Sequence, residues 1–348
     1  MNYIGVDYHK SYSVATVMNK NGRILAQRKL ANRLDAFKTF LEPFGEAKAA
    51  VEATRSWAVP VEILEQLVDE VVLGNPYLIK AIARTKFGRN DKIDSKVLAK
   101  LLQLDWLPEA YLRSKVNRDQ QSILRVRCFF VRLRTKLKNR IHDLIDRQPE
   151  PIREHARTFS DLFGKQGRNW LESLQLEHPD QPLLKQLLAA YGALSEQIKG
   201  SDGLVNELFK SDSNCGLVAS VPGFGPFFSV LSNVEIGDIG RFPNVSHLCS
   251  YAGLVPWTEG SGGRIWHGPI IKQSNHWLRW AFVEAAIPAT VADDGLRSYY
   301  EYYRRLKGAK TARVIIGRRL CCIVYRVLRQ KTPYYEQKPR VSNYRQAG

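Results

Sequence analysis

Cysteine is scarce in this sequence and follows no paired pattern. There are five cysteines, an odd number without any Cys-x-x-Cys spacing, which argues against a disulfide framework and against a structural zinc site. They are Cys128, Cys215, Cys249, Cys321 and Cys322. No apolar stretch is long enough to span a membrane, and Asp7 interrupts the first apolar run, which argues against a signal peptide. We therefore expect a cytoplasmic protein with no membrane partner.

Acidic residues are also few relative to basic ones. The 348 residues include 34 Asp and Glu against 52 Lys and Arg, a formal net charge of +18. Such an excess implies an anionic partner, most simply nucleic acid. The length allows two or three domains with sizeable cores, and the 44% hydrophobic content argues against a disordered chain.

The positive charge is concentrated in two segments. Residues 113–140 carry ten basic side chains against Asp119 alone, and residues 304–340 carry twelve against Glu336 alone. These are the candidate nucleic-acid surfaces. In the second segment and just before it, tyrosines such as Tyr302 and Tyr335 lie among the cations. They could stack on bases or pack beneath one more helix.

The first basic segment also has an apolar seam, which predicts a long amphipathic helix able to pack on another helix or subunit. The seam is Ile123, Val126, Phe130, Leu133, Leu137, Ile141 and Leu144. Six cations lie largely off the seam, where they could follow a phosphate backbone. They are Arg125, Arg127, Arg132, Arg134, Lys136 and Lys138. The alternative is a solvated helix face. Apolar residues near Leu184 suggest a second helix that returns along the first.

The first third of the chain alternates between strand and helix patterns. Strands are predicted at residues 3–7, 14–18, 23–29, 48–52 and 71–73, and helices at 34–41, around 63–68, after Pro76 and from Asp91. The predicted order is β-β-β-α-β-α-β-α, which is an α/β domain.

Four acids lie at the ends of predicted strands or at the start of a predicted helix. Asp7 and Glu52 end two predicted strands, and Asp91 and Asp94 share one turn at the start of a predicted helix. Carboxylate oxygens of this kind suit Mg²⁺ or Mn²⁺, and two such ions can activate an attacking oxygen and stabilise a leaving one. Each acid alone has a simpler explanation, as a helix-dipole partner or a solvated strand end.

A serine in a glycine-rich stretch is the second candidate for chemistry. Ser261 precedes Gly262-Gly263-Arg264, and Arg264, Lys272 and Arg279 could surround a phosphate and stabilise transition-state charge. A turn residue is the simpler explanation for the serine.

Upstream of this serine, a turn contains two glycines, Gly223 and Gly225. It is typical of a helix-hairpin-helix, in which backbone amides contact a DNA phosphate, but an ordinary helix connection has the same pattern.

Together these motifs resemble the DEDD transposases of insertion sequences, a family that includes bridge-RNA-guided recombinases and Piv-type DNA invertases. The resemblance rests on Asp7, Glu52 and Asp91-x-x-Asp94, on residues 221–225, on Ala252-Gly253-Leu254-x-Pro256, on Ser261-Gly262 and on Leu278-Arg279. It covers roughly residues 3–110 and 213–290. Two positions depart from the family pattern, because Arg89-Asn90 precedes Asp91 and Ser274-Asn275 precedes the Leu-Arg region.

The resemblance implies four regions. These are a RuvC-like (RNase H-like) metal-binding domain at 1–112, a basic helical or coiled-coil region at 113–210, a mainly α serine transposase domain at 211–330 and a basic tail at 331–348. It implies that Asp7, Glu52, Asp91 and Asp94 bind Mg²⁺ or Mn²⁺ and that Ser261 forms a transient phosphoserine link to DNA.

The expected partners are double-stranded target and donor DNA, a noncoding guide RNA and further copies of the chain in a dimer or tetramer. The alternatives are a metal-dependent nuclease or junction resolvase, a Piv-type invertase without guide RNA, and a noncatalytic nucleic-acid-binding protein.

Overall fold

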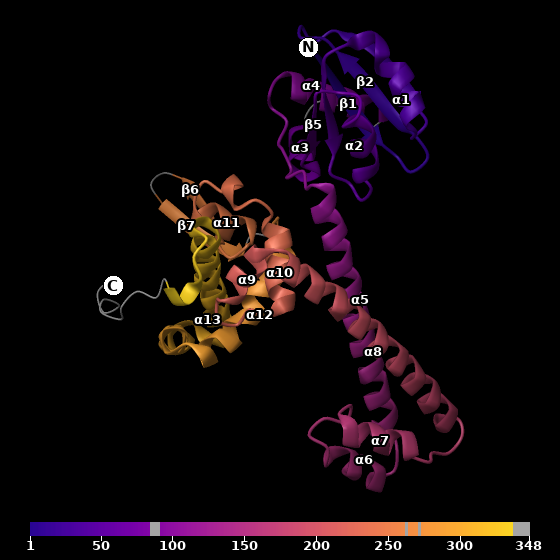
Figure 1. Ribbon diagram of the computed structural model, residues 1–348, viewed down its shortest axis with the longest axis vertical. Coiled ribbons are helices and arrows are strands. Elements are labelled where there is room, and N and C mark those ends of the chain that lie inside the picture. Colours follow the sequence, from indigo (N-terminus) through magenta and orange to yellow (C-terminus); the bar gives the residue numbers. More distant parts are fainter. Residues whose placement is uncertain (84–90, 262–263, 271–272, 337–348) are drawn as a thin grey trace. The chain divides into compact units, whose positions relative to one another are not determined.

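The chain folds into two compact units, Met1–Arg113 and Ser114–Gly348. The structure is a computed structural model that describes residues 1–83, 91–261, 264–270 and 273–336. Figure 1 labels the helices and strands of both units. Each unit has its own hydrophobic core.

The first unit contains a five-stranded sheet and four α-helices. Its strands are β1 Asn2–Tyr8, β2 Ser13–Met18, β3 Ile24–Leu30, β4 Ala47–Glu52 and β5 Glu70–Gly74. Its helices are α1 Leu34–Leu41, the 3-10 turn η1 Glu42–Phe44, α2 Ala58–Leu64, α3 Pro76–Ala83 and α4 Asp91–Gln103. This element order confirms the predicted β-β-β-α-β-α-β series, and the structure has two helices after the last strand, α3 and α4, where the predicted order ends in one.

The sheet is mixed, with the strand order β3-β2-β1-β4-β5. β1 pairs antiparallel with β2 and β2 antiparallel with β3, whereas β1–β4 and β4–β5 are parallel. A three-strand meander, β1 to β3, and two parallel crossover connections therefore share one sheet. This arrangement is compatible with an RNase H-like domain followed by a helical C-terminal part.

Helices cover both faces of the sheet. On one face Ile4, Val6 and Val51 pack under Phe37 of α1 and Leu64 of α2. The residues of opposite parity face the other way, since successive side chains on a strand alternate. There Ala50 and Val72 pack under α3 and α4.

The second unit begins with two long helices that lie side by side, α5 Lys115–Asp146 and α8 Asp180–Ser211. The predicted return helix is thus confirmed. Two short helices, α6 Glu150–Arg157 and α7 Lys165–Ser173, contribute to a small core at one end of this pair. Ile141, Leu171 and Leu184 are almost completely buried there.

The seam of α5 is one position away from the predicted one in its first half. Leu124 and Cys128 are buried, whereas Val126 is 48% exposed. Leu124 packs with Val205 of α8 and Leu231 in the helix that follows the glycine turn. The seam resumes as predicted at Ile141 and Leu144, because those residues face α8 and the small core.

The rest of the unit is a helical domain with one β-hairpin. Its elements are α9 Ser213–Ala219, α10 Pro226–Ile236, the 3-10 turn η2 Ile239–Arg241, α11 Val245–Tyr251, β6 Pro256–Ser261, β7 Arg264–Ile270, α12 His276–Ala292, α13 Asp294–Gln330 and the 3-10 turn η3 Tyr334–Glu336. Gly308, with φ +78°, divides α13 into two helical parts. The core holds Phe282 of α12 and Ile316 of α13, both fully buried.

No helix among the described residues combines the length and apolar character needed to cross a membrane. The five cysteines are free thiols, and four of them are buried. Their burial is that of small apolar residues in a core.

Candidate functional site

The sheet brings Asp7 and Glu52 to neighbouring strand ends. β1 and β4 are parallel with Val6 opposite Val51, so the next residue on each strand is one of the two acids. Asp7 is the second-last residue of β1, and Glu52 is the last of β4. The strand-end prediction therefore describes two adjacent positions at one edge.

Helix α4 starts against the same strands because β1 has a glycine there. A Cβ at Gly5 would lie 2.1 Å from the carbonyl oxygen of Ser95 and 2.4 Å from the amide nitrogen of Ala99. Only glycine allows this approach. The Ser95 hydroxyl also shares a 2.8 Å hydrogen bond with Thr16 of β2. This packing brings the first turn of α4, with Asp91 and Asp94, near the carboxyl end of the central strand β1.

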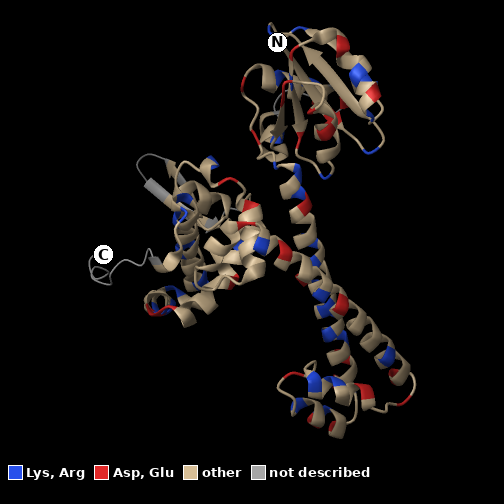
Figure 2. Ribbon diagram, in the orientation of Figure 1, with Lys and Arg blue, Asp and Glu red and all other residues tan. Residues whose placement is uncertain are grey.

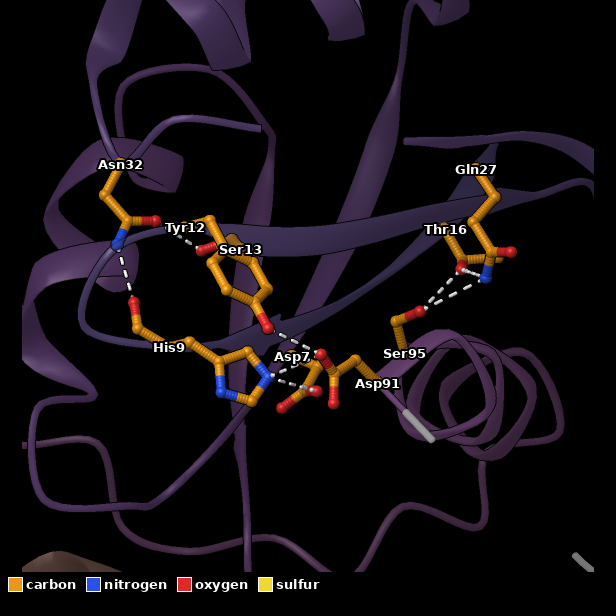
Figure 3. Close-up of polar contacts among 9 residues, drawn as sticks. All are labelled: Asp7, His9, Tyr12, Ser13, Thr16, Gln27, Asn32, Asp91 and Ser95. Carbon is orange, nitrogen blue, oxygen red and sulfur yellow. Dashed lines mark hydrogen bonds and ion pairs between the residues drawn. The ribbon is translucent and has the colours of Figure 1, made fainter. Parts of the chain in front are cut away.

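Asp7, His9 and Asp91 form a compact cluster. One ligand atom from each lies within 4.8 Å of the other two. His9 Nε2 is 3.1 Å from Asp7 Oδ2 and 3.4 Å from Asp91 Oδ2. Figure 3 shows the imidazole pointing at both carboxylates, with Tyr12 beside it. The Tyr12 hydroxyl donates a 2.8 Å hydrogen bond to Asp91 Oδ2.

The pKa shifts connect all four acids to one electrostatic site. Burial raises the pKa of Asp7, His9 opposes that rise, and the charges of Asp94 and Asp91 add to it. Burial also raises the pKa of Glu52, with further contributions from Asp7 and Asp94. The Tyr12 hydrogen bond lowers the pKa of Asp91. Each of these acids is therefore affected by the charge of at least one neighbouring group at this end of the sheet.

This donor set fits a divalent metal ion. Asp7 and Glu52 are held partly buried next to other carboxylates, and a divalent cation relieves that repulsion. Carboxylate oxygens are the ligands that Mg²⁺ and Mn²⁺ prefer, and imidazole is compatible with Mn²⁺ more than with Mg²⁺. The cluster of Asp7, His9 and Asp91 thus offers the ligand atoms that the expected ions, Mg²⁺ or Mn²⁺, would bind.

The sequence interpretation missed His9 and Tyr12. Both lie in the short segment between β1 and β2, which reads as a polar connection. Their rings are in contact with centroids 4.7 Å apart and planes tilted by 32°, and Lys29 Nζ of β3 lies 3.5 Å from the centroid of the Tyr12 ring. The sequence signal that could have identified His9 is its position two residues after Asp7, the acid at the end of a predicted strand.

Ser261 lies at the end of a β-hairpin. It is the last residue of β6 and pairs with Arg264, the first residue of β7. The hairpin was not predicted, although two glycines between alternating segments are typical of one. Lys272 and the side chains of Ser261 and Arg264 lie outside the described residues.

Arg279, the remaining predicted cation here, sits on the first turns of α12. Its guanidinium donates to the Ser274 hydroxyl. Asn275 caps the same helix by accepting hydrogen bonds from the amides of Trp277 and Leu278. The Ser274-Asn275 pair, where the sequence departs from the family pattern, thus orients the start of α12 and its arginine.

Family models match both regions that contain the acids and the serine. A transposase model of the IS110 DEDD type matches residues 4–148, and the model described as "Transposase IS116/IS110/IS902 family" matches residues 215–301. The chain belongs to the DEDD transposases of insertion sequences.

Individual relatives of this chain agree with the family models. The 43.6 kDa protein of insertion element IS110 from Streptomyces coelicolor is 29% identical over 158 residues, 45% of this chain. The chain matches 39% of that relative's length. The transposase for insertion sequence element IS1328 of Yersinia enterocolitica is 23% identical, with 81% of this chain and 82% of the relative aligned. The pilin gene-inverting protein of Moraxella bovis is 32% identical over 137 residues, 38% of this chain and 42% of its own length.

Figure 2 shows the positions of Lys and Arg along helix α5 in blue. By their contacts these cations divide into two groups. Arg125 pairs with Glu235 of α10, which is 1% exposed, and its guanidinium carbon lies 3.7 Å from the centroid of the Trp277 ring. Arg127 pairs with Asp202 of α8 at 2.6 Å. These two arginines have intramolecular partners, and Lys138 lies over the Phe163 ring at 4.7 Å. Arg132 and Lys136 are exposed and Arg134 is half-buried.

The glycines of the predicted helix-hairpin-helix turn differ from one another. Gly223 has φ +88°, and a Cβ there would lie 2.2 Å from the carbonyl oxygen of Ala285 on α12. Its missing side chain therefore accommodates a neighbouring helix. Gly225 is the N-cap of α10, exposed and with nothing within 4 Å of an added Cβ.

The C-terminal tyrosines also divide. The Tyr334 hydroxyl donates to Asp293 at 3.1 Å, and its ring packs on the helical core. Tyr302 and Tyr335 are 60% and 66% exposed. Packing on the helical core is therefore found for Tyr334, whereas base stacking by the exposed tyrosines stays a prediction. Residues 337–348, most of the predicted basic tail, lie outside the described residues.

Proposed function

We propose that this chain is a DNA transposase that cuts and exchanges DNA strands, with a metal-binding RuvC-like domain at 1–112 and a serine domain at 211–330. The observation that carries the proposal is the convergence of Asp7, His9 and Asp91 within 4.8 Å in a chain of the DEDD transposase family. The mutual pKa effects of Asp7, Glu52 and Asp94 support one shared centre.

In this proposal Asp7, Glu52, Asp91 and Asp94 hold Mg²⁺ or Mn²⁺, with His9 beside them. A divalent ion, when bound, supplies positive charge that stabilises the oxygens entering and leaving a phosphodiester. The protein's own contribution is orientation. Tyr12 holds one oxygen of Asp91, and Gly5 lets α4 lie close enough to β1 to bring the acids together.

Ser261 is the proposed nucleophile. Its oxygen attacks a DNA phosphorus, loses its proton and forms a phosphoserine bond, while the bond from phosphorus to a deoxyribose oxygen breaks and that oxygen gains a proton. Support comes from the family resemblance and from the place of Ser261 at a hairpin end. Arg279, oriented through Ser274, is a candidate to neutralise phosphate charge.

Target and donor DNA duplexes, a noncoding guide RNA and a dimeric or tetrameric assembly complete the proposal. The net charge of +18 supports polyanionic partners. A guide RNA would supply sequence choice by base pairing, with the protein holding the backbones.

A plasmid recombination assay with a denaturing gel for protein–DNA adducts tests the proposal. We expect Ser261→Ala to abolish adducts and strand exchange while DNA binding persists, because one oxygen is lost. Asp94→Asn should impair cleavage through metal binding, with partial recovery in Mn²⁺. Recombination by Ser261→Ala at the parent rate would refute the serine mechanism and favour a metal-dependent nuclease.

Site-specific inversion without a guide RNA is the second candidate. It is favoured by the 32% identity to the Moraxella bovis pilin gene-inverting protein over 137 residues. Purified protein acting on inverted sites in the absence of RNA would support inversion. Strand exchange that requires added RNA would support the guided transposase.

A further inference from the structure

The second unit has a pocket of about 330 Å³ lined by residues of α5, of the start of α10 and of α12. Its volume is at the lower end of the range for small-ligand sites, about 300–1,000 Å³. Gly225, Pro226, Phe227 and Phe228 line it from α10, and Trp280 lines it from α12. The α5 residues of its wall are Arg127, Cys128, Val131 and Arg132.

Three aromatic rings form one wall. Phe228 and Trp280 meet edge to face with centroids 5.0 Å apart, and Phe227 lies 5.4 Å from Phe228 and 6.0 Å from Trp280. This contact geometry fixes the rings relative to one another. Trp280 nevertheless keeps 37% of its surface exposed. An accessible indole is thus held in a rigid aromatic group.

The α5 part of the lining carries two arginines together with Cys128 and Val131. Arg127 lies with its guanidinium carbon 4.2 Å from the centroid of the Phe227 ring and is paired with Asp202. Arg132 is exposed, and its guanidinium carbon lies 5.2 Å from the centroid of the Trp277 ring next to Trp280. Arg132 therefore places positive charge at the rim of an aromatic pocket.

We propose that this pocket binds an unpaired nucleobase of a single-stranded nucleic acid, stacked on Trp280, with the adjoining phosphate at Arg132. The inference rests on the proposed function for its nucleic-acid partner and adds a site for strands outside a duplex. Base stacking on aromatic side chains together with backbone contacts from cations is the usual chemistry of single-strand binding. DNA strand exchange and a guide RNA both present such unpaired bases.

Charge complementarity favours this occupant over a protein segment. An apolar peptide would cover the rings but leave the Arg132 charge without a counterion. A second copy of the chain would bring the same net charge of +18 to a basic helix. A phosphodiester strand supplies a flat ring and an anion within one nucleotide.

The test measures binding of labelled eight-residue oligonucleotides to the full chain by fluorescence anisotropy. Oligodeoxythymidine and oligouridine form two arms, and a matched abasic strand keeps the phosphates while removing the bases. We expect Trp280→Ala to weaken binding of at least one base-bearing strand by about tenfold, the effect of losing one stacking contact. The arm that shows this loss identifies the strand as DNA or RNA.

Two variants separate stacking from folding. Trp280→Phe retains a ring and should bind within about threefold of the parent. Trp106→Ala changes a tryptophan that is 70% exposed in the first unit, and it should leave affinity unchanged. The abasic strand should bind parent and Trp280→Ala equally, because neither complex contains the stack.

Equal affinity of the parent and Trp280→Ala for both base-bearing strands would overturn the proposal, as would a loss shared by the abasic strand. A change of oligomeric state in Trp280→Ala by light scattering, with unchanged oligonucleotide affinity, would instead assign the pocket to a protein interface. Failure of the proposed function has another signature, since a parent protein inactive in recombination can still give the predicted oligonucleotide results.

Discussion

Replacing Gly223 by alanine tests whether this glycine serves packing or phosphate binding. The substitution places a methyl group 2.2 Å from the Ala285 carbonyl oxygen, well inside contact distance. It also puts alanine at φ +88°. The two costs are about 1–2 kcal/mol for left-handed backbone in an L-residue and about 1–3 kcal/mol for overpacking. We therefore expect the second unit to lose about 2–5 kcal/mol of unfolding free energy.

Gly225→Ala is the matched control two residues away. Gly225 has φ −81°, ψ 177°, and no atom lies within 4 Å of an added Cβ. Reduced freedom of the unfolded chain favours alanine, whereas the N-cap position slightly disfavours it, so the two effects largely cancel. The unfolding free energy should change by no more than about 0.5 kcal/mol.

Urea unfolding followed by tryptophan fluorescence measures both variants. With a slope of about 3 kcal/mol/M, a loss of about 3 kcal/mol lowers the midpoint by about 1 M. Duplex binding is measured in parallel below that midpoint. If Gly223→Ala were as stable as the parent but bound DNA less tightly, the packing argument would be wrong and the helix-hairpin-helix interpretation correct.

Three further predictions concern the charged groups. Arg125→Gln should cost about 3–5 kcal/mol in urea unfolding because it removes the cationic partner of the buried Glu235 carboxylate. Lys136→Gln should keep stability and reduce the salt dependence of DNA binding, and equal stability of the two variants would contradict this. Tyr12→Phe removes the hydrogen bond that lowers the pKa of Asp91 and should weaken metal activation of cleavage about tenfold, measured by metal titration, with an unchanged thermal midpoint. The pKa of Asp7 is raised above 3.8 in the metal-free fold, so the folded state holds this proton more tightly and stability falls as pH rises from about 3.8 through the raised pKa. In the presence of a chelator, the thermal midpoint of Asp7→Asn should therefore exceed that of the parent by more at pH 7 than at pH 4. The variant should also lose the stabilisation that Mn²⁺ gives the parent. An equal gain in midpoint at both pH values would show that the pKa of this carboxylate is not raised.

The order of elements in the first unit was predictable because its signals are local. A strand such as β4 has both faces covered, and Ala47–Glu52 reads as a short apolar run ending in an acid. Helix α4 is predicted by the helical spacing of Leu98, Leu101 and Leu102, which all face the sheet. Each pattern depends on residues within a few positions, so no knowledge of the sheet order is needed.

The position of His9 and Tyr12 was not predictable in the same way. Tyr12 meets Asp91 only because β1 and β2 are paired and α4 crosses them, a contact between residues 79 positions apart. Sequence spacing gave the face of α4 on which Asp91 and Asp94 lie. It gave no direction for side chains in the connection after β1, where neither the strand nor the helix period applies.

The basic helix illustrates a different limit. Charge counting treats all ten cations of residues 113–140 as equivalent, although Arg125 lies beside a carboxylate 110 positions away and beside Trp277. Arginine suits such a place because its planar guanidinium can stack on a ring and pair with a carboxylate at once. A lysine there would satisfy only the charge.

That distinction reassigns part of the protein's positive charge from DNA binding to folding. Glu235 accepts hydrogen bonds from Gln121 and Arg125 of α5 with one oxygen, and its other oxygen accepts from Asn275 at the start of α12. Asn275 in turn caps the helix that carries Arg279 and Trp280. A buried acid of this kind is stable only while its donors are in place. The pairing of α5 with Glu235 therefore supports the positions of Arg279, the candidate phosphate-binding arginine, and of the aromatic pocket. For this reason substitution of Arg125 should affect folding, whereas substitution of Lys136 should affect only DNA binding.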